Sequence, residues 1–340
     1  MGHFDYPAVD FESHPSRYRH WDLEIDGEVA TLTMHIKDDG PLWDGRYELK
    51  LNSYDLGVDV ELNDAVQRLR FEHPEVKAVI LTGAYDKIFC AGANIRMLGM
   101  VPHAFKVNFC KYTNETRVSI EDATANSGQI YIAALNGTAS GGGYELALAC
   151  DDILLIDDGN AAVSLPEVPL LGVLPGTGGL TRLTDKRKIR RDVADVFCTK
   201  AEGFRARDAK KFKLIDESYP RSKWSAGVAA RAQMHVEKMK ANFPLRTGPG
   251  IELPALERTD TENGWSYKYV DVELDGRQAS LVMRGPDAAP ERSADTWSLR
   301  AFRELEDSLL RLRVNHLNVG LVVVRTSGDS AAVLEHEAYI

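Results

Sequence analysis

The chain has 340 residues, 44% of them apolar, which is enough to bury a large core. Its net charge is −10 and its pI about 5.5, so its overall field repels nucleic-acid phosphates and anionic lipid. No stretch reaches the roughly 18 consecutive apolar residues of a membrane span. We therefore expect neither nucleic acid nor a membrane as a partner.

Cysteine and histidine usage bears on the compartment and on metal binding. The four cysteines lie far apart without a CxxC pair, at Cys90, Cys110, Cys150 and Cys198. The chain opens with polar and acidic residues rather than a secretory apolar stretch. Reduced thiols and a cytoplasmic location are expected. The nine histidines show no paired metal spacing, so no metal site is expected.

The first elements alternate between strand and helix. Apolar residues alternate on both sides of the Asp26-Gly27 turn within Tyr18–Met34, which predicts a two-stranded hairpin. Apolar residues at helical spacing then predict a helix over 58–69. The short apolar runs Val76–Leu81, Ile130–Leu135 and Ile153–Ile156 predict buried strands. Together they indicate an α/β fold with a parallel sheet and crossover helices.

A basic run follows these strands, at Lys186, Arg187, Lys188, Arg190 and Arg191. It could hold a phosphate-bearing ligand. Acidic neighbours on both sides of the run favour a solvated helix face instead.

The beginning of the chain recurs near its end. Tyr267–Met283 repeats Tyr18–Met34, with eight identical residues that include the Asp-Gly turn, and 304–313 (ELEDSLLRLR) resembles 61–70 (ELNDAVQRLR). The stretch 244–264 is rich in Pro, Gly and Thr and has no periodicity. We predict a catalytic domain over 1–260 and an incomplete second unit over 261–340, which would join the remainder of a longer chain.

Three glycine-containing turns follow or lie between these elements, at 89–95, 136–146 and 175–179. None forms GxGxxG, GxxxxGK[ST] or GxSxG, which argues against those nucleotide cradles and against a serine hydrolase. Glycines between a strand and a helix can expose backbone N–H groups to a negative charge. Two such turns could together stabilise the oxyanion or enolate of a thioester carbonyl. Ordinary loops remain the alternative.

Two glutamates have unusual positions. Glu145 follows the glycine run at a helix start, and Glu167 follows Pro166 in an otherwise apolar stretch. Apolar surroundings raise a glutamate pKa toward neutrality, which suits a general acid or base. A helix cap or an ion pair with Arg182 explains the same positions, so both interpretations stay open.

The three turns resemble, in order, motifs of the crotonase (enoyl-CoA hydratase/isomerase) superfamily. The matching segments are FCAGANI (89–95), ALNGTASGGGYELALACD (134–151) and LPEVPLLGVLPGTGGLTRL (165–183), and the resemblance runs from Asp22 to about Asp216. It implies a crotonase-like ββα spiral with crossover helices, followed by the start of a second such unit.

The resemblance also implies a site. The N–H groups of Ala93 and Gly142 would form the oxyanion hole, and Glu145 and Glu167 would act on water. The residues expected to contact substrate are Ala91, Gly92, Asn94, Gly141, Gly143 and Pro166, with the backbone at 91 and 93 meeting the adenine end of coenzyme A. Asn94 stands where the family usually has Asp, and residues 37–50 look inserted.

The N-terminal stretch, the insertion and the second unit resemble a ring-opening branch of this superfamily. That implies a lyase that opens 2,3-epoxybenzoyl-CoA or its dihydrodiol with water to 3,4-dehydroadipyl-CoA semialdehyde and formate, in aerobic benzoate degradation. No cofactor beyond the coenzyme A of the substrate is implied, and a homodimer is expected. The alternatives are an enoyl-CoA hydratase or isomerase on another acyl-CoA and a non-catalytic acyl-CoA-binding scaffold.

Overall fold

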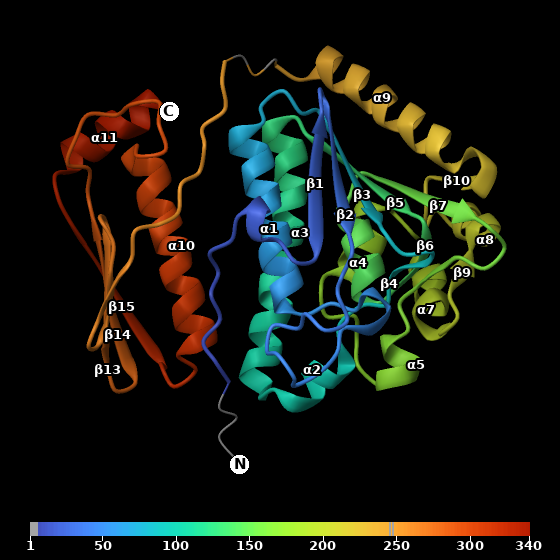
Figure 1. Cartoon of the computed structure of the whole chain (residues 1–340), viewed down its shortest axis with the longest axis horizontal. Coiled ribbons are helices and arrows are strands. Elements are labelled where there is room, and N and C mark those ends of the chain that lie inside the picture. The colour runs from blue at the N-terminus through green and yellow to red at the C-terminus, as the bar shows by residue number, and fades with distance from the viewer. Residues whose placement is uncertain (1–5, 245, 247) are drawn as a thin grey trace. The chain divides into compact units, whose positions relative to one another are not determined.

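The computed structural model describes residues 6–244, 246 and 248–340, which form two compact units (Figure 1). The first unit is Ser13–Pro249, and the second combines residues 6–12 with Gly250–Ile340. The division therefore lies inside the aperiodic stretch 244–264, ahead of the predicted boundary at 260. Residues 6–12 belong to the second unit, which was not predicted.

The first unit is built on a six-stranded sheet in the order β1-β2-β3-β5-β7-β10. Its hairpin turns at Gly27 (φ +59°), and every later neighbour in the sheet pairs in parallel. The predicted hairpin and parallel sheet are thus confirmed, and β3 begins two positions after the predicted Val76. The strands are β1 (Trp21–Asp26), β2 (Val29–Met34), β3 (Ala78–Gly83), β5 (Ile130–Leu135), β7 (Asp152–Asp157) and β10 (Glu217–Pro220).

Helices cover both faces of this sheet. Apolar residues of α9 pack against β3, β5 and β7, while α1 and α3 lie side by side on the other face (Figure 1). Asp55 caps α1 by accepting the N–H of Val58 at 3.2 Å. The helices are α1 (Leu56–Glu72), α2 (Ile95–Met100), α3 (His103–Ser127), α4 (Gly142–Ala149), α5 (Glu167–Leu171), α6 (Gly179–Thr181), α7 (Arg191–Thr199), α8 (Ala206–Lys211) and α9 (Trp224–Asn242).

A second, smaller sheet positions the glycine turns. Its order is β4-β6-β8-β9, and β4 pairs in parallel with β6. The sequence did not predict it, because strands of two to four residues are too short to show a periodicity. The strands are β4 (Lys87–Cys90), β6 (Gly137–Ser140), β8 (Ala162–Ser164) and β9 (Phe204–Arg205).

The second unit repeats the start of the first. Its hairpin turns at Gly276 (φ +57°), α10 follows, and β15 then pairs in parallel with β14, as β3 pairs with β2. Trp265, Val272 and Leu281 belong to its own apolar core. Its elements are β11 (Thr259–Thr261), β12 (Gly264–Ser266), β13 (Val270–Asp275), β14 (Gln278–Arg284), α10 (Trp297–Asn315), β15 (Leu321–Ser327) and α11 (Ser330–Tyr339).

In the first unit, polar residues of α1 fasten the segment that leads into the hairpin. The Tyr18 hydroxyl donates to Asp64 at 2.6 Å, and Arg68 donates to the same carboxylate at 2.8 Å. Glu61 accepts the N–H of His20 at 2.9 Å. The hydrogen bonds explain why 61–70 carries acidic residues on a partly buried helix face.

The same connections occur in the second unit. Tyr267 donates its hydroxyl to Asp307, and Arg311 donates to that carboxylate at 2.5 Å. Glu304 accepts the N–H of Tyr269 at 2.7 Å. The repeated sequence therefore preserves a buried hydrogen-bonded connection between hairpin and helix, as well as an apolar pattern.

No helix in the described part of the chain combines the length and the hydropathy needed to cross a bilayer.

Candidate active site

The two glycine turns that follow β4 and β6 meet in space. Because these strands are parallel neighbours, their turns leave the same edge of the small sheet. Gly92 has φ +91°, and a Cβ at this position would lie 2.8 Å from the carbonyl oxygen of Ser140 and 3.0 Å from the nitrogen of Gly142. Only glycine allows this approach.

Two backbone N–H groups are left available where the turns meet. The residues on both sides of Ala93 are hydrogen-bonded to the backbone of Tyr54. The Tyr54 N–H donates to the Gly92 carbonyl, and the Asn94 N–H donates to the Tyr54 carbonyl, each at 2.8 Å. Gly142 is the first residue of α4, a position whose N–H has no acceptor within the helix. Across the described residues, neither the Ala93 nor the Gly142 N–H donates a hydrogen bond.

Both amides line a cavity of about 260 Å³, which we call the main cavity. Its polar lining includes Glu145, Glu167, Thr177 and Arg117. Its apolar lining comes from α2, α3 and the segment 170–174: Ile95, Leu98, Phe109, Leu170, Leu171, Val173 and Leu174. An apolar chamber with a few convergent polar groups is typical of a small-molecule site.

Glu145 is 2% exposed and is held by donors from the third glycine turn. It accepts the N–H groups of Thr177 and Gly179, each at 2.9 Å, and the Thr177 hydroxyl. Gly179 begins α6, so Glu145 does cap a helix start. The alternative of an ion pair with Arg182 is wrong, because Arg182 pairs with Glu121 at 2.9 Å.

Glu167 is half-buried at the start of α5, and its Oε2 has no hydrogen-bond partner in the described structure. Its Oε1 lies 2.8 Å from where a Cβ on Gly141 would be. Burial raises the pKa of Glu167 to about 7, and repulsion from the Glu145 carboxylate adds to the rise. Glu167 can therefore take up or release a proton near neutral pH.

The other expected substrate contacts divide into two groups. Ala91, Gly92, Gly141 and Pro166 line the main cavity with the two glutamates. Gly143 lies outside this lining, and a Cβ there would come within 2.6 Å of Cys90, so its lack of a side chain serves packing of α4.

Asn94 also lies outside the main cavity. Its side chain accepts the N–H of Met97 at 2.9 Å, which caps α2, and donates to the Ser53 hydroxyl at 2.9 Å. It borders a second hollow, the side cavity, which shares Ala91, Ala93 and Ile95 with the main cavity. The side cavity is lined by Glu48, Lys50, Ser53, Ala91, Ala93, Asn94, Ile95 and Arg96.

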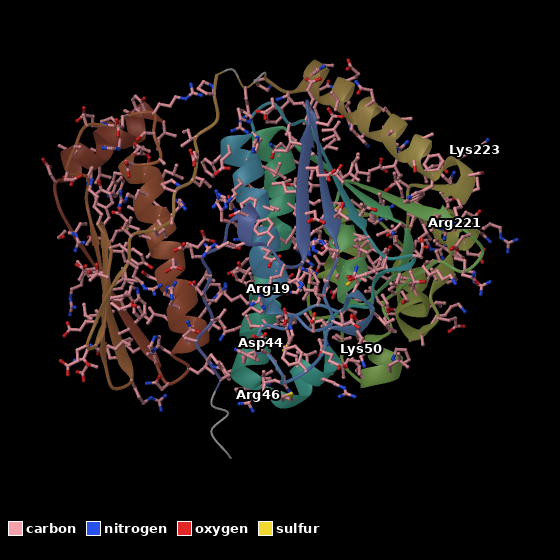
Figure 2. The ribbon with its side chains drawn as sticks, viewed as in Figure 1. Arg19, Asp44, Arg46, Lys50, Arg221 and Lys223 are labelled. Atoms are coloured by element: carbon pink, nitrogen blue, oxygen red, sulfur yellow. The ribbon has the colours of Figure 1, made fainter. Side chains whose placement is uncertain are left out.

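The side cavity contains two cations, Lys50 and Arg96, that were not predicted from the sequence. The one available signal was that Lys50 ends the inserted segment 37–50. Figure 2 shows Arg46 and Lys50 of this segment well away from Arg221 and Lys223, which lie near the start of α9. The inserted segment therefore brings Lys50 to the lining of the side cavity, together with its ion-pair partner Glu48 at 2.6 Å.

The basic run at 186–191 forms ion pairs. The Arg187 side chain is only 10% exposed, so part of this run is not the solvated helix face that we predicted. The pairs are Lys186 with Glu121 (3.0 Å), Arg187 with Asp216 (3.1 Å) and Arg190 with Asp192 (2.5 Å). These three charges are compensated, which makes their part of the run a poor phosphate site.

This site and fold correspond to a known class of enzymes. The sequence profile of the enoyl-CoA hydratase/isomerase family matches residues 48–245, and the chain belongs to this family. A benzoyl-CoA-dihydrodiol lyase of Aromatoleum evansii is 53% identical to the chain over 342 residues. The match covers 98% of this chain and 61% of that relative, so the chain spans about three fifths of the relative's length.

Solved structures agree with the family assignment. An enoyl-CoA hydratase from Geobacillus kaustophilus HTA426 is 30% identical, with a TM-score of 0.55 over 67% of this chain and 84% of that chain. An enoyl-CoA hydratase from Bacillus anthracis is 26% identical, with a TM-score of 0.53 over 66% of this chain and 78% of that chain. The crotonase fold is thus confirmed.

Proposed function

We propose that the chain is a ring-opening lyase that acts on the coenzyme A thioester of a dearomatised benzoyl group. The observation that carries this is the meeting of four groups in one cavity: the N–H groups of Ala93 and Gly142 and the carboxyl groups of Glu145 and Glu167. The name of the relative from Aromatoleum evansii supports the choice of acyl group.

The overall reaction consumes water and no oxidant. The dihydrodiol thioester plus one water gives 3,4-dehydroadipyl-CoA semialdehyde and formate, and the 2,3-epoxide needs a second water to open its ring first. Two carbon–carbon bonds of the ring break, one on each side of the carbon that leaves as formate. The chemistry consists of proton transfers and addition of water, so we propose no cofactor apart from the coenzyme A of the substrate.

The four groups divide this work. The two amides would polarise the thioester carbonyl and stabilise the enolate that forms when the ring bond breaks. Glu167, with its free oxygen and a pKa of about 7, would exchange a proton with a ring hydroxyl or water. Glu145, fixed by Thr177 and Gly179, would accept a proton or hold a water in a set orientation.

The side cavity would take the coenzyme A end. Arg96 lies beside the backbone at 91 and 93 and suits its phosphates. Lys50, which pairs with Glu48 at 2.6 Å, would exchange that carboxylate for a phosphate. We further propose a homodimer in the cytoplasm, in keeping with free cysteines at 90, 110, 150 and 198. Sedimentation of the purified chain tests the dimer, and a monomer would reject it.

Substrate assays test the proposal. The purified chain is given 2,3-epoxybenzoyl-CoA or crotonyl-CoA, and release of formate from the first is measured. Formate release supports the lyase, whereas hydration of crotonyl-CoA without formate release would replace it by a plain hydratase. Glu145→Gln and Glu167→Gln should each lower turnover by ~10² to 10⁴. Glu217→Gln, at a half-buried glutamate that pairs with Lys210 outside the cavity lining, serves as the control.

A further inference from the structure

A buried group of polar side chains lies behind the two amide-bearing turns. Asp59 on α1 is 0% exposed and Arg117 on α3 is 1% exposed. Asp59 accepts the hydroxyl of Tyr54 and, at 3.1 Å, the hydroxyl of Thr116. The Arg117 guanidinium lies 5.7 Å from the centre of the Tyr54 ring. Two full charges buried this deeply cost much desolvation energy, so core stability alone is a weak explanation for them.

Arg117 makes its short hydrogen bonds to backbone carbonyls rather than to the acid. Its Nη2 donates to the carbonyl of Gly142 at 3.0 Å and its Nη1 to that of Thr113 at 2.8 Å. The distance from Nη1 to the Asp59 carboxylate is 3.7 Å, and Nε has no partner in the described structure. These distances indicate that Arg117 holds the backbone of Gly142 in place rather than forming a tight ion pair with Asp59.

Tyr54 connects the same group to the other turn. Its backbone N–H and carbonyl bond the residues on both sides of Ala93, at 2.8 Å each. Its side chain reaches Asp59. A continuous path therefore runs from the Ala93 turn through Tyr54, Asp59 and Arg117 to Gly142. The two turns that it joins lie close together: a Cβ on Gly142 would be 3.4 Å from the Ala93 nitrogen. Both residues line the main cavity.

We propose that Tyr54, Asp59 and Arg117 are positioning residues that hold the Ala93 and Gly142 amides at the spacing needed to grip one acyl oxygen. Arg117 also places a buried positive charge beside the main cavity, which it lines. A charge in such surroundings strengthens polarisation of a carbonyl. The inference rests on the proposed function and adds the residues that set up its oxyanion hole.

The test measures polarisation of the acyl carbonyl directly. Benzoyl-CoA labelled with ¹³C at its carbonyl is bound to the full chain, and the ¹³C chemical shift and the affinity are recorded. The variants are Tyr54→Phe, which removes only the hydroxyl, and the double variant Arg117→Met with Asp59→Asn, which leaves no lone buried charge. Arg68→Met is the matched control, because Arg68 is equally buried and paired with acids but lies outside the cavity lining.

We expect the parent and Arg68→Met to show the same downfield shift, and the double variant to lose most of it. Affinity should change less than about tenfold while kcat falls by ~10². Tyr54→Phe should lie between them and decides the matter if the double variant fails to fold. An unchanged shift and kcat in folded variants would overturn the inference. Failure of the parent to bind the probe or shift its carbonyl would instead count against the proposed function.

Discussion

Glu145 and Glu167 lie in one cavity but differ in how their oxygens are used. Three donors from Thr177 and Gly179 bind both oxygens of the Glu145 carboxylate, which fixes its orientation. Glu167 keeps a buried oxygen without a partner in the described structure. A buried polar atom without a partner is costly, and a substrate that supplies a donor would remove that cost. This difference favours Glu167 as the group that exchanges protons with the ligand.

The pH dependence of the reaction should reflect this role. Because the pKa of Glu167 is about 7, kcat/KM measured against pH should bend near pH 7. In Glu167→Gln that bend should vanish together with most of the activity. A parent profile that is flat between about pH 5.5 and 8.5 would contradict the assignment.

Stability should respond to the same titration. The pKa of Glu167 rises from 4.5 to about 7 on folding, so between these values the unfolded chain loses the proton first. The free energy of unfolding should therefore fall as the pH rises through this window. Glu167→Gln should be more stable than the parent at about pH 8, by roughly 1–3 kcal/mol after screening, and equally stable near pH 4. Urea unfolding at both pH values measures this.

Gly141 supports Glu167 through its missing side chain. In Gly141→Ala the new Cβ would lie 2.8 Å from Glu167 Oε1, at a φ of +52°. We expect a loss of about 1 kcal/mol from the backbone and a fall of ~10² in kcat/KM from the displaced carboxylate. Gly27→Ala is the control, since Gly27 has a φ of +59° and nothing within 4 Å. Equal losses of activity in both variants would rule out a specific effect at Gly141.

At the scale of elements, the sequence predicted the strands and helices that are long enough to show a periodicity of apolar residues. Alternation over Tyr18–Met34 and helical spacing over 58–69 predicted β1, β2 and α1. The small sheet was not predicted, because β9 has two residues and β8 three, too few to show a periodicity. The glycine motifs nevertheless identified the turns that this sheet positions. The donors to Glu145 could not be foreseen, because Thr177 and Gly179 lie more than thirty residues along the chain.

The repeated connection between hairpin and helix can be tested in both copies. Tyr18→Phe and Tyr267→Phe each remove a hydroxyl that donates to a helix carboxylate, Asp64 or Asp307. Each should lower stability by about 1–3 kcal/mol, seen as faster hydrogen exchange in α1 or α10 respectively. Tyr85→Phe, at a 39% exposed tyrosine, should change exchange far less. Equal exchange in all three variants would contradict the prediction.

At the scale of the whole molecule, each unit has its own apolar core. The sequence predicted a boundary at 260, because loss of periodicity over 244–264 is typical of a linker, and the two units divide at 249/250. It could not assign residues 6–12, whose link to the second unit includes hydrogen bonds between Val9 and Asn315. Contacts between such distant positions leave no local pattern.

Two cores should unfold in two transitions. A coenzyme A thioester at about 100 times its Kd should raise the stability of the 13–249 transition by about 2.7 kcal/mol and leave the other unmoved. Tyr267→Phe should shift only the transition of the second unit. Calorimetry with and without benzoyl-CoA measures both, and a single transition that moves in both experiments would contradict the prediction.

The Glu167 oxygen that has no partner among the described residues also suggests how ligand binding could be blocked selectively. A non-hydrolysable coenzyme A thioether whose ring carries an amine or hydroxyl would offer that oxygen the donor it lacks. The same compound without the donor would leave that oxygen unpaired and should inhibit more weakly. The difference in inhibition between this pair of compounds would then report on one atom of the protein.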